Sequence, residues 1–258
     1  VQPRLRIQDR SHYSSGMENS EGVFHLVGLF TVGFAAIFFF TDRHGRTSRA
    51  LSLCLLALGA RLLLAPAELQ GSSVALSAVA RVLEAITILA LMDWPRRIAE
   101  TLSQRIARAA NALFRAAQIL VLVYAGLSLG YLALDPADAT TAAAGAFRVR
   151  ALEWAVFAPV LGTAILLSTI AILLLLFSRA DPAESIRLRA LMVAAPFLLV
   201  ALVVKPANVP YWIALGLLFV LFGSVRYLMV QGRRGQFMSQ FLAPEVARLV
   251  RLKGVDEV

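Results

Sequence analysis

Long apolar runs separated by short polar segments make up most of this chain of 258 residues. A helix needs about 20 mainly apolar residues to cross a bilayer core that is about 30 Å thick. Seven runs approach that length, and each predicts one membrane-spanning helix. They cover residues 22–40, 50–65, 73–92, 112–134, 154–177, 189–204 and 211–230. The pattern therefore predicts an all-α fold, a polytopic membrane bundle of seven transmembrane helices.

Arginines are unevenly distributed over the connections between these runs. They gather after the first, third, fifth and seventh runs, at Arg43, Arg46, Arg49, Arg96, Arg97, Arg105, Arg108, Arg179, Arg187, Arg233 and Arg234. Cytoplasmic connections of membrane proteins carry an excess of Lys and Arg. This bias places the N-terminus outside and the C-terminus in the cytoplasm, and an odd number of spans keeps the basic connections on one face.

Three regions follow from this reading. Residues 1–21 form an extracytoplasmic tail or the stub of a larger segment, since the chain opens without Met. Residues 22–230 form the seven-helix transmembrane domain. Residues 231–258 form a cytoplasmic, coiled-coil-like connector, which we expect to be a signalling helix that leads to a missing catalytic domain.

Composition agrees with a membrane protein. Hydrophobic residues make up 59% of the chain and charged residues 16%, against roughly 45–50% and about 25% in soluble domains. The net charge of +9 is explained by the orientation of the helices, so we expect no nucleic-acid partner. A single cysteine, Cys54, excludes an intramolecular disulfide and a cysteine metal cluster, and the three histidines show no metal-ligand spacing.

Three ionisable residues fall well inside predicted spans, namely Arg61, Arg81 and Glu84. Their distances from the span ends let Arg61 and Glu84 meet near mid-depth on antiparallel neighbours. Intramembrane charges cost free energy unless they are paired or hydrated. One interpretation is a structural ion pair that fixes the helix register. Another is an outward-facing pocket for a lipid headgroup or small anionic ligand, and a third is ion or proton transport.

Four further residues near the outer ends of spans extend the candidate ligand site. They are His25, Tyr131, Glu153 and Trp154. Each one alone is typical of the membrane interface, so their membership in the site depends on whether the helices bring them together.

A set of residues spaced alternately three and four apart begins in the last span and continues into the polar connector. The positions are Val220, Gly223, Tyr227, Val230, Arg234, Phe237 and Phe241. A heptad seam of this kind suits a parallel dimer, and its alternative is the core-facing and lipid-facing pattern of one helix. Gly232 and Gly235 weaken the helix and predict a hinge. Pro244 fits the first turn of a second short helix.

The connector also carries a recognisable sequence. Residues 237–250, Phe-Met-Ser-Gln-Phe-Leu-Ala-Pro-Glu-Val-Ala-Arg-Leu-Val, resemble the segment immediately before the catalytic domain in many bacterial class III adenylyl cyclases. The resemblance implies a homodimeric cytosolic domain after Val258 that converts ATP to cyclic AMP with two divalent metal ions, Mg or Mn. None of that family's catalytic residues falls in this chain. The resemblance also implies a bacterial plasma membrane location.

The predicted architecture is similar to bacterial seven-transmembrane receptors that carry diverse signalling modules. We therefore expect the membrane sensor and anchor region of a dimeric adenylate cyclase. The residues predicted to couple or dimerise are Tyr227, Val230, Arg234, Phe237, Phe241 and Pro244. The alternatives are a passive dimerising anchor and a sensor with another output, such as a histidine kinase or diguanylate cyclase.

Overall fold

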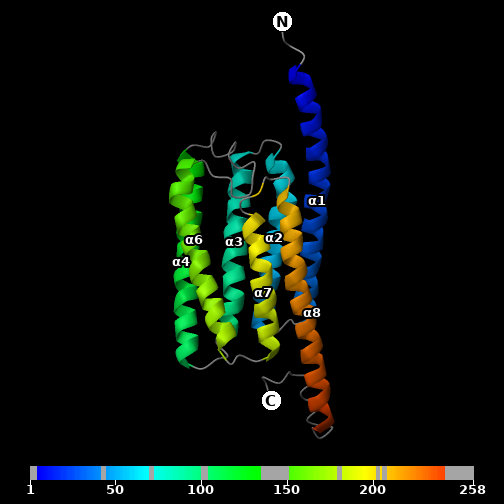
Figure 1. Ribbon diagram of the computed structural model, residues 1–258, viewed down its shortest axis with the longest axis vertical. Helices are drawn as coiled ribbons and strands as arrows, with labels where there is room; N and C mark the ends of the chain where they lie inside the picture. The colour runs from blue at the N-terminus through cyan, green and yellow to red at the C-terminus, as the bar shows by residue number, and fades with distance from the viewer. Residues whose placement is uncertain are drawn as a thin grey trace.

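The computed structural model describes residues 5–41, 45–69, 73–99, 104–134, 151–178, 182–201, 204 and 208–241. Within these ranges the chain folds into seven helices and contains no strand (Figure 1). The helices are α1 (Leu5–Thr41), α2 (Arg46–Leu69), α3 (Val74–Ala99), α4 (Gln104–Leu134), α6 (Ala151–Phe177), α7 (Pro182–Ala201) and α8 (Val209–Phe241). The prediction of an all-α bundle is confirmed.

Six of these helices are long and apolar enough to cross a membrane, which identifies a multi-pass membrane protein. The apolar segments are Glu21–Thr41, Arg46–Glu68, Val74–Ala99, Arg105–Leu134, Ala158–Phe177 and Val209–Arg233. The exception is α7, which carries Glu184, Arg187 and Arg189 in its first eight residues. The sixth predicted span, residues 189–204, thus belongs to a helix of the bundle that is shorter than the other six and whose charges lie close together near its start.

Each of the seven helices extends beyond its predicted run at one end or both. α1 begins at Leu5, so most of the predicted tail belongs to the same helix as the first span. α2 continues through Pro66 to Leu69. α8 passes Gly232 and Gly235 without a break and ends at Phe241. Helix elongation is cooperative, so an apolar span can carry its helix into polar flanks that hydropathy assigns to tails or connections.

α1 and α8 lie side by side and project from opposite ends of the bundle (Figure 1). At 1.5 Å per residue the 37 residues of α1 measure about 55 Å, well beyond a bilayer core of about 30 Å. The two helices together therefore link the two ends of the molecule.

Small residues allow several helices to pack closely. Ala110 and Ala117 of α4 and Ala164 and Ala171 of α6 are fully buried and share one core. The two residues of each pair are seven apart, so each pair lies on one helix face. Alanine at such positions lets helix backbones approach, as is usual inside membranes where van der Waals packing drives association.

α8 packs against α7 through its own small residues. A β-carbon at Gly216 would lie 2.8 Å from Cδ2 of Leu198, and one at Gly223 would collide with Ala190. Gly223, Val220 and Tyr227 of the predicted seam are also buried. The first part of this seam therefore packs within the chain, and any seam for a second copy is confined to residues after Tyr227.

Candidate functional site: a polar cluster between α2, α3 and α4

α2 contributes an ion pair to the interior of the bundle. Nη2 of Arg61 lies 2.8 Å from Oε2 of Glu68, and the two side chains are only 11% and 4% exposed. The residues are seven positions apart, so they lie on the same face of the helix, about 10 Å apart along its axis. Their long side chains bridge that distance, and each charge compensates the other where water is largely excluded.

α3 and α4 contribute two further polar contacts. The hydroxyl of Tyr124 donates a hydrogen bond of 2.8 Å to Oε1 of Glu84, and both residues are buried. Nη1 of Arg81 donates to Oγ of Ser128. Arg81 and Glu84 are three residues apart and Tyr124 and Ser128 are four apart, so each pair occupies one helix face. The two contacts join these faces.

The four charged groups form one electrostatic unit. Arg61 and Arg81 both act on the carboxylate of Glu84, and the carboxylate of Glu68 also acts on it. The structure thus brings together the three residues singled out in the sequence and adds a second carboxylate. Two guanidinium groups and two carboxylates balance in formal charge, so the cluster has no excess positive charge that would favour an anionic ligand.

Hydrogen-bonding capacity in this cluster is only partly used. Nε and Nη1 of Arg61 and Nε of Arg81 are buried and have no hydrogen-bond partner among the described residues. Buried donors are normally paired with protein or water. The three donor nitrogens therefore fit water molecules or a small ligand with acceptor atoms, held beside a charge-balanced network.

The other four residues predicted for this site lie on three helices, α1, α4 and α6. Tyr131 is half-buried and packs beside Tyr124 in the same core. His25 is exposed on α1, and its Nδ1 is 3.0 Å from the carbonyl oxygen of Glu21 on the same helix. Glu153 and Trp154 lie on α6, but their side chains are outside the described residues. Whether any of these residues binds a ligand stays a prediction.

Sequence reasoning missed Glu68, Tyr124 and Ser128. Glu68 lies after Pro66, where the predicted span had already ended, although its spacing of seven from Arg61 placed both on one face. Tyr124 and Ser128 are uncharged residues in an apolar run. No hydropathy signal separates them from residues that face lipid.

A second polar contact lies where α8 leaves the bundle. The guanidinium carbon of Arg187, a fully buried residue of α7, lies 3.5 Å from the ring centroid of Tyr227 on α8. Nε2 of Gln231 donates a hydrogen bond of 3.2 Å to the Tyr227 hydroxyl, and the carboxylate of Glu184 also interacts with this tyrosine. Tyr227, predicted to couple or dimerise, is thus a contact between α7 and α8.

The remaining connector residues are less well defined. Val230 is half-buried. Arg234, Phe237 and Phe241 lie on α8, but their side chains are outside the described residues, and Pro244 is outside them altogether. Their roles in coupling or dimer formation stay predictions, as does the hinge at Gly232 and Gly235.

Comparison with protein-family models, with curated proteins and with solved structures gives no match.

Proposed function

We propose that this chain is the membrane sensor and anchor region of a dimeric class III adenylyl cyclase. Its cytosolic catalytic domain would follow the connector and convert ATP to cyclic AMP with two Mg or Mn ions. The observation that carries the proposal is the course of α8. It runs as one helix from inside the bundle to Phe241, five residues into the segment that resembles the cyclase connector.

The proposal includes seven passes through a bacterial plasma membrane, with the N-terminus outside and the C-terminus in the cytoplasm. Support comes from α1 and α8, which project from opposite ends of the bundle as an odd number of passes requires (Figure 1). The charges of α7 are compatible with a short span, because Arg187 is fully buried on Tyr227 rather than facing lipid.

In this proposal α8 is the output helix, and Tyr227 determines its rotational setting. The ring is held by the Arg187 guanidinium and the hydroxyl by Gln231. A change in the packing of α7 would therefore alter the orientation of α8 where it leaves the bundle. Two such helices in a homodimer would pass that change to a catalytic site formed between subunits.

In this proposal the polar cluster is the site at which a bound molecule changes the packing of the bundle. α2 packs against α1 and α3, and α3 packs against α4, so a molecule bound to the free Arg61 and Arg81 donors would alter three helices at once. Glu84→Gln tests this role, because it keeps the size of the side chain and removes its charge. Cyclic AMP formation that does not change at equal membrane expression would leave the cluster a structural ion-pair network.

Insertions into the full-length protein after Gln236 test the coupling. One inserted residue rotates the following helix by about 100°, whereas seven residues nearly restore its phase. We expect the single insertion to alter cyclic AMP formation and the seven-residue insertion to retain it. Equal output from both insertions would instead support a passive dimerising anchor.

A second comparison separates failure of the coupling from failure of the activity. The full-length protein is expressed in a bacterial strain without a cyclase of its own, and cyclic AMP is measured in its membranes with Mg and with Mn. Absence of cyclic AMP from a protein that is expressed and folded would contradict the cyclase proposal. It would favour another output, such as a histidine kinase or diguanylate cyclase.

A further inference from the structure

Four arginines and one aspartate gather where α2 begins and α3 ends. Arg46 and Arg49 lie in the first turn of α2, and Asp93, Arg96 and Arg97 lie near the end of α3. They line one groove with a volume of about 820 Å³, to which α4 contributes Gln118 and Leu122. This groove is separate from the cluster around Glu84.

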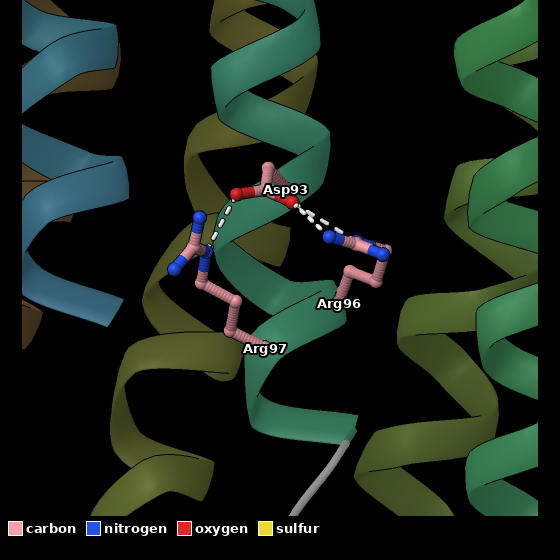
Figure 2. A network of polar contacts seen from close by, with 3 residues as sticks. All are labelled: Asp93, Arg96 and Arg97. Atoms are coloured by element: carbon pink, nitrogen blue, oxygen red, sulfur yellow. Dashed lines mark hydrogen bonds and ion pairs between the residues drawn. The ribbon is translucent and has the colours of Figure 1, made fainter. Parts of the chain in front are cut away.

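Asp93 fixes two of the arginines on either side of it (Figure 2). Its Oδ1 accepts hydrogen bonds of 2.9 and 2.7 Å from Nε and Nη2 of Arg96, and its Oδ2 accepts one of 2.6 Å from Nε of Arg97. A guanidinium group has five N–H donors. Both arginines are therefore oriented by Asp93 and keep donors for a further acceptor.

The groove has an excess of positive charge. Arg46 and Arg49 are exposed, and within the described residues neither forms an ion pair. The groove is thus lined by four guanidinium groups and a single carboxylate. Guanidinium groups bind phosphate oxygens with two parallel hydrogen bonds, which makes arginine well suited to phosphate recognition.

Apart from Gln118, the other residues that line the groove are apolar. They are Ala50, Leu53, Ile86, Leu89, Ala90 and Leu122. Leu53 and Leu122 are 52% and 57% exposed, which places apolar surface beside the lipid. Ile86 lies ten residues from Arg96, about 15 Å along the helix. The groove is thus basic at one end and apolar at the other.

We propose that this groove binds one anionic phospholipid from the adjacent membrane leaflet. The phosphate lies among the guanidinium groups of Arg46, Arg49, Arg96 and Arg97, and an acyl chain lies along Leu53 and Leu122. Charge selects an anionic headgroup, because the choline of a zwitterionic lipid would meet four positive groups. The positive-inside rule makes this the cytoplasmic leaflet, where basic sites between helices bind acidic lipids. The site does not depend on the cyclase proposal.

Lipid titration followed by native mass spectrometry tests the site. The purified full chain is titrated with phosphatidylglycerol and, separately, with phosphatidylcholine carrying the same acyl chains. We expect the first phosphatidylglycerol to bind roughly tenfold more tightly than phosphatidylcholine, and Arg46→Gln/Arg49→Gln to lose most of that preference. Arg105→Gln/Arg233→Gln removes the same charge from two exposed positions outside the groove and should keep the preference.

Two other results would overturn the proposal. The first is an equal loss of preference in both double variants, which would mean that overall charge and not the groove selects the lipid. The second is full displacement of phosphatidylglycerol by millimolar glycerol phosphate, which would identify a site for soluble anions.

A further variant tests the apolar part separately. Leu53→Trp fills the groove at an exposed position without altering the arginines, and should weaken binding of the first phosphatidylglycerol severalfold. Unchanged binding would contradict the placement of the acyl chain. Circular dichroism of each variant shows whether it has folded.

Discussion

Arg61 and Glu68 of α2 form an ion pair of 2.8 Å in the interior of the helix bundle. Both residues come from one helix, so the pair itself fixes no contact between helices. Each of the two buried charges instead compensates the other. A buried charge left without its partner strongly destabilises a fold, whereas replacing both partners by apolar residues is often tolerated. The two residues should therefore behave as a unit on mutation.

Glu68→Leu should lower the free energy of unfolding by about 3 kcal/mol, because it leaves the Arg61 guanidinium buried with fewer partners. Arg61→Leu should have a similar effect through Glu68. The double variant should lose clearly less than the sum of the two. Equilibrium unfolding in mixed micelles with increasing dodecyl sulfate measures all three. Strictly additive losses would mean that the two charges do not depend on each other.

Tyr124→Phe should destabilise the bundle by about 2 kcal/mol, because it removes the hydroxyl that donates to the buried Glu84 carboxylate and leaves the ring in place. Tyr211→Phe is the matched control, since Tyr211 is 51% exposed near the start of α8. The same unfolding assay should show almost no change for the control. Equal effects of the two variants would remove the Tyr124–Glu84 bond from the stabilising contacts.

The helix pattern of this protein was largely predictable from hydropathy, because six of the seven described helices contain an apolar run long enough to cross a membrane. The ends were less predictable. α1 starts at Leu5, well before the first apolar run, and α2 continues past Pro66. Apolar length determines where a helix can cross a membrane, but cooperative elongation determines where it ends.

The polar cluster was predictable only where its residues are charged. Arg61, Arg81 and Glu84 stand out in apolar runs because charge inside a membrane needs compensation. Tyr124 and Ser128 do not stand out, and they matter only because α4 packs beside α3. Such partners depend on the relative rotation of two helices, which hydropathy of a single sequence does not contain.

Gly59→Ala should destabilise the contact between α1 and α2. The added methyl would lie 2.7 Å from Cγ2 of Val32 and 3.0 Å from the backbone oxygen of Gly28, so the helices must separate at an expected cost of about 1–3 kcal/mol. Gly33→Ala on α1 is the control, because its methyl meets nothing within 4 Å. Alanine favours a helix, so the control should be neutral or more stable by up to about 1 kcal/mol. A neutral Gly59→Ala would show that the two helices tolerate a wider separation.

Tyr227→Leu should loosen the exit of α8, because it removes the aromatic ring from the fully buried Arg187 and the hydroxyl from Gln231. A desolvated cation–π contact is worth about 2 kcal/mol, so we expect amide hydrogen exchange in residues 224–233 to accelerate at least tenfold. Phe222→Leu is the control on the same helix, since Phe222 is 72% exposed.

The control should exchange like the natural protein in this segment. Equal acceleration in both variants would mean that side-chain volume on α8, rather than the Arg187 contact, sets the stability of the exit. Acceleration confined to Tyr227→Leu would show that the contact between α7 and α8 holds this part of α8 in place. Tyr227→Phe then separates the two parts of that contact, because it keeps the ring on the guanidinium and loses only the hydroxyl, and it should exchange at an intermediate rate.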